Sequence, residues 1–368
     1  MKKIYISKPF LDDKDKSSLI KTFDSSWISS VGEKINIFEN NFAKYTGSKY
    51  SLTCSNGTQA IELSLRALNI KKNDEVIVPN LTFAATINAV INVGAKPVIL
   101  DCNNENFSFN KKELKKAIGP KTFAIIFVHL MGIPINIINN LKGIKKNFYI
   151  IEDCAESLGS KINSIHTGNF SDCATFSFFS NKIITTGEGG MINFKKKSTF
   201  NLAKKIKNQG RSLNKYYWHD HLGGNYRITN LQASLGITQL SKINRMIKMR
   251  KKIYEIYDEK LQKYNFINPL HKKIECNFNE ISYWYYTIFI NSYDLKKRDK
   301  LIKELSKKGI ETRPLFYPLS DMKIYNPYLF KGDTNSRYLS YSSLSLPTYP
   351  GLKKEEINYI IKILVNSI

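Results

Sequence analysis

The sequence TFSFFSNKIITTGEGG, residues 175–190, places a lysine after a predicted strand and before a glycine-rich turn. This residue, Lys182, lies among aromatic, hydroxyl and apolar residues, whereas the other lysines lie in solvated runs. A lysine in such surroundings can have a lowered pKa and act as an amine nucleophile. Ser177 and Ser180 could supply hydroxyl groups to an anion. Taken alone, the stretch is also compatible with a lysine in a surface turn.

Further upstream, the sequence SNGTQA at 55–60 favours the start of a helix, which Ser55 or Asn56 can cap. The small residues leave backbone N–H groups exposed at the positive end of this helix, where a phosphate binds well. An ordinary capped helix without a ligand is the alternative interpretation.

Between these two sites, the sequence IIEDCAE at 150–156 places an acidic pair at the end of an apolar strand. Open α/β sheets bind ligands outside the carboxyl ends of their strands. A carboxylate there could bind a metal, a ribose or a protonated ring nitrogen, or it could cap the next helix. Together, a phosphate cradle, a strand-end carboxylate and a lysine in a Ser-rich turn are what pyridoxal phosphate requires.

Around these motifs the chain alternates short apolar runs with helical patterns, which is typical of an α/β fold. Several runs are apolar on both faces, as expected of buried, largely parallel strands. The predicted strands are 75–79, 96–101, 123–128, 148–153, 174–178 and 190–194, and the predicted helices include 57–69 and 80–93.

A long helical pattern covers 228–264 and predicts a single helix that bridges two domains. The elements predicted after it are a strand at 283–290 and helices at 295–308 and 353–365. We therefore expect a large domain over residues 1–240, with a mostly parallel sheet that binds pyridoxal phosphate. A smaller C-terminal α+β domain is expected over residues 241–368.

Composition limits the classes of protein that this chain can belong to. With 42% hydrophobic residues among 368, it can bury a sizeable core. The formal net charge of +25 draws anions such as nucleic acid, acidic membrane or a phosphorylated substrate. The 5 cysteines include no Cys-x-x-Cys pair, so neither a disulfide framework nor a metal site is predicted. Without a signal peptide or a membrane-spanning run, we expect a cytoplasmic protein with no membrane attachment.

The sequence resembles, almost from end to end, the DegT/DnrJ/EryC1/StrS sugar aminotransferases, which are pyridoxal-phosphate enzymes of fold type I (aspartate aminotransferase-like). Within that family it is most similar to the GDP-perosamine synthases. The motifs that carry the resemblance are SNGT (55–58), PNLTFAAT (79–86), AKPV (95–98), VHLMG (128–132), EDCAESLGS (152–160), FSF (176–178), TTGEGGM (185–191), NYR (225–227) and ETRPLFYPL (311–319).

The resemblance implies roles for individual residues. Lys182 would bond to the aldehyde of the cofactor and Asp153 would pair with its ring nitrogen, so these two would be catalytic. The other residues expected to contact the cofactor are Phe83 on the ring, Glu156 beside the phenolic oxygen, Gly57, Thr58 and Ser177 at the phosphate, and Asn225 reaching in from a partner subunit. That last contact makes a homodimer part of the site. Trp27, Arg313 and Tyr317 would border the pocket for the sugar nucleotide.

The implied reaction moves an amino group from L-glutamate, which leaves as 2-oxoglutarate, to a nucleotide-linked 4-keto-6-deoxy sugar for a surface polysaccharide such as an O-antigen. The alternatives are a pyridoxal-phosphate-dependent sugar dehydratase, an aminotransferase for a 3-keto sugar, and a basic regulatory or nucleic-acid-binding protein on the same fold. Dehydratases for GDP-keto sugars have a histidine in place of Lys182. We expect no nucleic-acid partner, because both Lys182 and Asp153 are present. His129, at a predicted strand end, could contact substrate or be a structural histidine.

Overall fold

The structure is a computed structural model that describes residues 3–212, 214–274, 279–332 and 334–368. Cys276, one of the cysteines noted above, lies outside the described residues. The other four cysteines are buried as free thiols.

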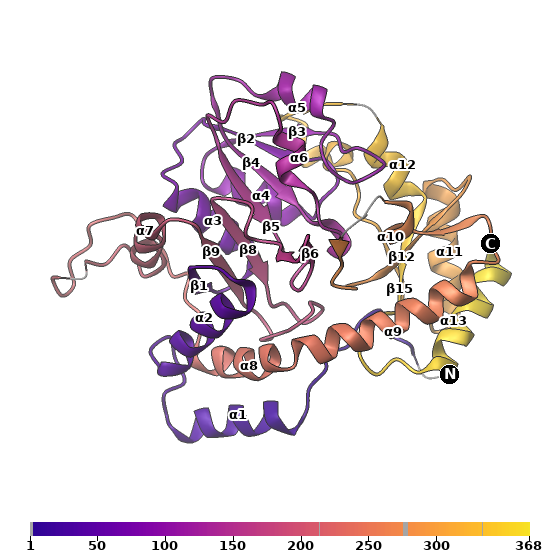
Figure 1. Ribbon diagram of the computed structural model, residues 1–368, viewed down its shortest axis with the longest axis horizontal. Helices are drawn as coiled ribbons and strands as arrows, with labels where there is room; N and C mark the ends of the chain where they lie inside the picture. Colours follow the sequence, from indigo (N-terminus) through magenta and orange to yellow (C-terminus); the bar gives the residue numbers. More distant parts are fainter. Residues whose placement is uncertain (1–2, 213, 275–278, 333) are drawn as a thin grey trace.

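An 8-stranded mixed sheet lies at the centre of the molecule, with helices around it (Figure 1). The strand order is β1-β9-β8-β5-β4-β2-β3-β14, and every neighbouring pair is parallel except the two pairs that include β9. The strands are β1 (Tyr50–Cys54), β2 (Glu75–Pro79), β3 (Lys96–Leu100), β4 (Thr122–Val128), β5 (Tyr149–Asp153), β8 (Cys173–Ser177), β9 (Gly190–Phe194) and β14 (Leu329–Lys331).

This sheet confirms the predicted α/β fold. All six strands predicted for this sheet are present, and each end lies within one residue of its predicted position. The strand predicted at 283–290 lies in the C-terminal part and begins three residues later, as β12 (Tyr286–Ile290). The strands β4 and β5 are buried along most of their length, because helices or loops cover both faces of the sheet. The edge strands β1 and β14 were not predicted from the sequence.

Helices pack on the sheet and on one another. Helix α3 contacts α4 and α7, while α8 contacts both α1 and α2. The helices of this part are α1 (Asp13–Asp24), α2 (Glu33–Thr46), α3 (Gly57–Ala67), α4 (Ala84–Asn92), α5 (Lys111–Ala117), α6 (Ile137–Leu141), α7 (Lys197–Lys207) and α8 (Asn230–Ser241).

The C-terminal part of the chain has its own 4-stranded antiparallel sheet, in the order β10-β12-β15-β13. Helix α13 packs against α9 and α11 beside it. A 3-stranded sheet, β11-β6-β7, joins residues of both parts. The elements are β6 (Lys161–Ile162), β7 (Ile165–His166), β10 (Ile267–Pro269), β11 (Asn279–Glu280), β12 (Tyr286–Ile290), β13 (Arg313–Pro314), β15 (Ser343–Leu346), α9 (Ile243–Leu261), α10 (Leu270–Lys273), α11 (Leu295–Lys307), α12 (Asn335–Tyr341) and α13 (Lys354–Ser367).

The prediction of one helix over 228–264 was wrong, because the structure has two helices there, α8 and α9 (Figure 1). Between them Lys242 has a ψ of 9°, outside the helical range. The ammonium group of Lys242 forms ion pairs with Asp12, at 2.9 Å, and with Asp15 of α1. The apolar periodicity continues across this break, so the pattern alone did not reveal it.

Two backbone pairings link the N-terminal and C-terminal parts of the chain. Near the N-terminus, Ile4 forms a parallel bridge with Ile310, and β14 from the C-terminal part pairs with β3. The predicted boundary at residue 240 falls at the end of α8 and stays a prediction.

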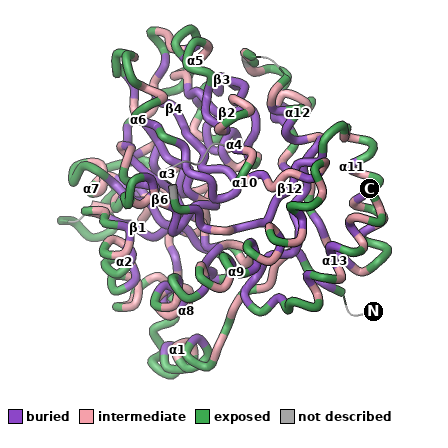
Figure 2. The backbone as a smooth tube through the Cα atoms, turned by 45° about the vertical axis from the view of Figure 1, so that its right-hand side comes forward, coloured by how far each residue is buried: buried purple, intermediate pink, exposed green. Residues whose placement is uncertain are grey.

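Figure 2 shows that the buried residues gather along the strands, while the outer faces of the helices are exposed. One continuous hydrophobic cluster extends from the large sheet into the C-terminal part. Within the described ranges, no helix combines the length and the apolar character needed to cross a membrane.

Gly190 offers a test of how closely β9 packs against the start of α3. A Cβ atom on Gly190 would lie 2.6 Å from the backbone oxygen of Asn56, which cannot yield without moving α3. We expect Gly190→Ala to lower the free energy of unfolding by about 1–3 kcal/mol in urea denaturation, as overpacking does. In the control Gly119→Ala, the new Cβ meets no described atom within 4 Å, so stability should hardly change. Equal stability of the two variants would contradict this packing.

Candidate active site

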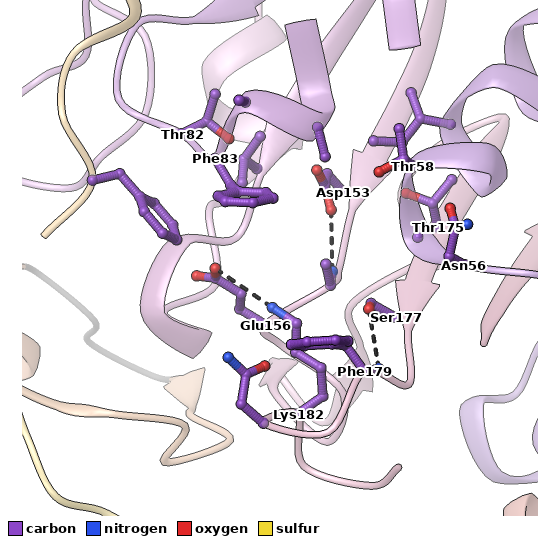
Figure 3. A pocket seen from close by; sticks show the side chains of 18 of the residues that line it. Asn56, Thr58, Thr82, Phe83, Asp153, Glu156, Thr175, Ser177, Phe179 and Lys182 are labelled. Atoms are coloured by element: carbon purple, nitrogen blue, oxygen red, sulfur yellow. Dashed lines mark hydrogen bonds and ion pairs between the residues drawn. The ribbon is translucent and has the colours of Figure 1, made fainter. Parts of the chain in front are cut away.

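A cavity of about 900 Å³ opens where the carboxyl ends of β5 and β8 meet the starts of α3 and α4 (Figure 3). Residues from the C-terminal part form another wall. The lining includes Asn56, Gly57, Thr58, Thr82, Phe83, Met131, Asp153, Glu156, Ser177, Phe179, Asn181, Lys182, Glu188, Trp284, Tyr285, Arg313, Phe316 and Tyr317. The three motifs singled out in the sequence therefore meet in one place.

Lys182 follows β8, and its backbone N–H donates to the Phe179 carbonyl at 2.9 Å, which forms a turn. Its ammonium group points toward Glu156, and Nζ lies 3.8 Å from Glu156 Oε1 (Figure 3). Burial lowers the pKa of the Lys182 amine, although the carboxylates of Glu156 and Asp153 act in the opposite direction. A larger share of the amine is therefore neutral, the form that attacks a carbonyl carbon.

Glu156 shares this buried region. Its Oε2 accepts a hydrogen bond from the backbone N–H of Met131 at 2.8 Å, and Met131 has a positive φ of 55°. Burial raises the pKa of the Glu156 carboxyl to about 7. The group can therefore hold or release a proton near neutral pH beside Lys182.

The two acidic residues at the end of β5 point to different places. Asp153 enters the cavity, where its Oδ1 accepts from the Ala155 N–H at 3.1 Å and its Oδ2 from the Thr86 hydroxyl at 2.9 Å. Burial raises the pKa of the Asp153 carboxyl, so a cation placed beside it would stabilise its charged form. Strand alternation turns the neighbouring Glu152 away from the cavity.

Glu152 is fully buried and has a structural role. Its oxygens accept from the N–H groups of Gly168 at 2.7 Å and Phe170 at 2.9 Å, and from the hydroxyl of Ser171 at 2.6 Å. His129 Nε2 lies 3.0 Å from Glu152 Oε1, and His129 Nδ1 accepts from the Ile135 N–H. Nδ1 therefore has no proton, so Nε2–H donates to Glu152. His129 is fully buried and is a structural histidine.

The start of α3 lies at the other end of the cavity. Asn56 caps this helix, since its side chain accepts from the Gln59 N–H at 2.9 Å. The first amides of a helix have no partner within it, which leaves those of Gly57 and Thr58 for a ligand. A Cβ on Gly57 would lie 3.0 Å from the Cβ of Ser177, so glycine keeps the helix start close to the end of β8.

The cavity also has an aromatic wall. Phe83 precedes α4, lines the cavity and is 59% exposed, so its ring has room for a flat ligand. The ring of Phe316 lies 5.5 Å from that of Phe83. The two rings give this part of the cavity an apolar surface against which a planar ligand can lie.

The four remaining predicted site residues divide into two pairs. Arg313 and Tyr317 line the cavity, and the ring of Tyr317 lies 4.8 Å from the guanidinium of Arg298. Trp27 and Asn225 do not line it within one chain, and both are exposed.

Trp284 and Tyr285, which reach the cavity from the C-terminal part, were not predicted from the sequence. Thr86, the hydroxyl donor to Asp153, was not predicted either. The aromatic run Tyr283–Tyr286 was visible in the sequence, but it lies about a hundred residues from Lys182 and read only as a strand. Thr86 is in the first turn of α4, where a threonine is unremarkable by sequence alone.

These residues fit pyridoxal phosphate. The buried Asp153 carboxyl, with its raised pKa, suits a protonated ring nitrogen, and the exposed ring of Phe83 suits a planar heterocycle. The amides at the start of α3 suit a phosphate, and the buried amine of Lys182 suits an aldehyde.

The order of the sheet and the fit of its cavity to this cofactor place the chain among the pyridoxal-phosphate-dependent transferases of fold type I. The chain belongs to the DegT/DnrJ/EryC1/StrS aminotransferase family, whose model matches residues 9–365. It is thus a pyridoxal-phosphate-dependent sugar aminotransferase, as its sequence predicted.

Two similar proteins support this assignment, and a third, a dehydratase, is similar in fold and binds the same cofactor. The GDP-perosamine synthase of Escherichia coli O157:H7 is 39% identical over 98% of this chain and 97% of its own length. The sugar aminotransferase Spr1654 from Streptococcus pneumoniae, in its pyridoxal phosphate form, has a TM-score of 0.91 at 26% identity, with 100% of both chains covered. The E. coli GDP-4-keto-6-deoxy-D-mannose-3-dehydratase, with bound hydrated cofactor, has a TM-score of 0.88 at 25% identity, covering 99% of this chain and 100% of its own.

The two carboxylates at the end of β5 should respond differently to amide substitution. Asp153→Asn removes the charge that faces the cavity, and we expect a loss of transamination on the order of a hundredfold to a thousandfold without loss of stability. In Glu152→Gln an NH₂ group replaces one of the accepting oxygens, so a buried donor loses its acceptor. We expect the free energy of unfolding to fall by about 1–3 kcal/mol, while turnover stays close to that of the wild type. Turnover assays and urea denaturation would check both. If Glu152→Gln lost turnover and Asp153→Asn lost stability, the catalytic and structural roles of the two residues would have to be exchanged.

Proposed function

We propose that this enzyme transfers the amino group of L-glutamate to carbon 4 of a nucleotide-linked 4-keto-6-deoxy sugar, with GDP as the favoured nucleotide. We further propose a cytoplasmic location and a product destined for a surface polysaccharide such as an O-antigen. The observation that carries the proposal is the meeting of Lys182, Asp153 and Glu156 in one cavity of a sugar aminotransferase. The similarity to the GDP-perosamine synthase named above supports the choice of sugar and nucleotide.

When bound, pyridoxal phosphate supplies an aldehyde for amines and a ring that withdraws electrons from the bonded carbon. Asp153 would place a negative charge beside the ring nitrogen and so favour its protonated form. The amides of Gly57 and Thr58, with the hydroxyl of Ser177, would bind the phosphate. Phe83 would orient the ring by packing against it.

Lys182 Nζ performs the proton transfers. Because burial lowers its pKa, the neutral amine can take a proton from the α-carbon of glutamate and give one to carbon 4 of the sugar. Glu156, with a pKa of about 7, holds a proton 3.8 Å away and exchanges it with Lys182. Arg313 and Tyr317, at the outer wall, bind the sugar nucleotide, where the guanidinium of Arg313 can hold its diphosphate.

The proposed unit is a homodimer with composite sites. The segment between α7 and α8 leaves the body of the molecule as a projecting loop (Figure 1). Its apolar side chains are exposed to solvent in one chain, including Tyr217 at 80% and Leu222 at 88%, which favours a partner that covers them. Asn225 lies near the base of this loop and is exposed, so it is available to reach the cofactor of a second subunit.

Product analysis tests the reaction. We expect the purified protein, with pyridoxal phosphate and glutamate, to convert a GDP-4-keto-6-deoxy sugar faster than its dTDP and UDP counterparts. Mass spectrometry and NMR should find an amino group in place of the keto oxygen at carbon 4, and Lys182→Ala should form none. A product that has lost a hydroxyl group would indicate a dehydratase, and amination at carbon 3 would indicate the 3-keto-sugar aminotransferase.

Mixed dimers test the composite site. One site of a heterodimer of Lys182→Ala and Asn225→Ala subunits carries both changes, and the other carries neither. We expect such heterodimers to recover about half of the wild-type activity per dimer, provided that Asn225→Ala alone is impaired. Purified heterodimers that stay as inactive as Lys182→Ala would mean that each site is built within one chain.

A further inference from the structure

Trp284 touches Lys182 from the wall that the C-terminal part supplies. Lys182 Nζ lies 4.2 Å from the centre of the Trp284 ring, within the range of a cation–π contact. The indole Nε1–H donates to the carbonyl of Asn181 at 2.7 Å. Trp284 is buried and lines the cavity. One side chain thus holds both the amine of Lys182 and the peptide that precedes it.

Helix α9 fixes the backbone of this segment. Arg250 Nη1 donates to the carbonyl of Trp284 at 2.7 Å, and the Tyr254 hydroxyl donates to the carbonyl of Tyr285 at 2.6 Å. The ring of Trp284 also stacks on that of Tyr285 at 4.2 Å. Two buried side chains of one helix therefore set where the indole stands.

A strained residue lies beside the tryptophan. Tyr283 has a positive φ of 55°, which is unfavourable for a bulky side chain and persists only where its surroundings hold it. On the other side of Tyr283, the Ser282 hydroxyl donates to the backbone carbonyl of Glu156 at 2.8 Å. The same short segment thus contacts both Glu156 and Lys182.

Several charged groups surround the amine of Lys182. Glu156 lies 3.8 Å away and Asp153 also acts on the amine, while Glu188 and Arg313 also line the cavity. Burial lowers the pKa of the Lys182 amine. Against that trend, an aromatic face attracts the ammonium form and favours it over the neutral amine.

We infer that Trp284 is a positioning residue for Lys182: its indole N–H holds the Asn181 peptide in place, and its ring face holds the ammonium form of the lysine beside Glu156. The inference rests on the proposed role of Lys182 as the amine that bonds the cofactor. If the tryptophan only filled space, its removal would admit water to the amine. The pKa of Lys182 would then rise, because burial would no longer lower it.

The test measures the protonation of Lys182 in the cofactor-free protein. Fluorodinitrobenzene labels neutral amines, so labelling of the Lys182 peptide across a pH series, quantified by mass spectrometry, gives the apparent pKa. With Trp284→Leu we expect the midpoint to fall by about one pH unit, because the contact that favours the ammonium is lost. A midpoint that is unchanged or higher would overturn the inference.

Two further variants sharpen the result. Trp284→Phe keeps an aromatic face but loses the N–H, so its midpoint should fall less, while amide hydrogen exchange in the Lys182 peptide should rise about fivefold. If Trp284→Leu fails to fold, Trp284→Phe decides. A wild-type labelling midpoint and wild-type amide exchange in Trp284→Phe would then overturn the inference. The matched control is Phe200→Leu, which removes a ring 5.5 Å from Lys204 on α7, away from the cavity. It should leave the Lys182 midpoint unchanged.

A parallel experiment separates this inference from the proposed function. Wild-type protein is loaded with pyridoxal phosphate, reduced with borohydride and digested. Cofactor fixed to Lys182, with wild-type labelling midpoints and amide exchange in the Trp284 variants, would overturn the positioning role alone. Cofactor fixed to another lysine would overturn the proposed role of Lys182 and this inference with it.

Discussion

The burial of one amine between two carboxylates is the constraint on which the site depends. The side chains of Lys182, Glu156 and Asp153 are largely withdrawn from water. Burial lowers the pKa of the amine and raises the pKa of both carboxyls, which favours the neutral form of each group. Such a group of charges is unfavourable in a protein without a ligand. In the arrangement proposed above, the bound cofactor makes the group favourable, because it brings a cationic ring nitrogen to one carboxylate and an aldehyde to the amine. The site therefore trades stability of the empty protein for chemistry near neutral pH.

The fold holds this group from several directions. The carboxyl ends of β5 and β8 are in register, with Asp153 paired to Thr175, so the acidic strand end and the lysine turn lie side by side. Glu152, one residue away, anchors the loop at 168–171 through its hydrogen bonds. Opposite, Arg250 on α9 holds the Trp284 backbone against the lysine. Local strand pairing and long-range packing thus position the same amine.

The sequence predicted the elements that depend on local pattern. Buried strands, the capped start of α3 and the turn around Lys182 carry their signals within a few residues, so the fold and the centre of the cavity could be predicted. Two kinds of feature could not. At the break, Lys242 pairs with Asp12 and Asp15, which are distant in sequence. Trp284 likewise reaches Lys182 only through tertiary packing. The resemblance to the family, rather than any pattern, suggested Asn225, whose proposed role needs a second chain.

A crystal structure of the protein loaded with pyridoxal phosphate tests the central claim most directly. We predict electron density continuous from the Lys182 side chain into the cofactor, with the ring nitrogen facing Asp153 and the phosphate at the start of α3. Density that joins the cofactor to a different lysine, or that places the ring nitrogen away from Asp153 in a fully occupied site, would contradict the account.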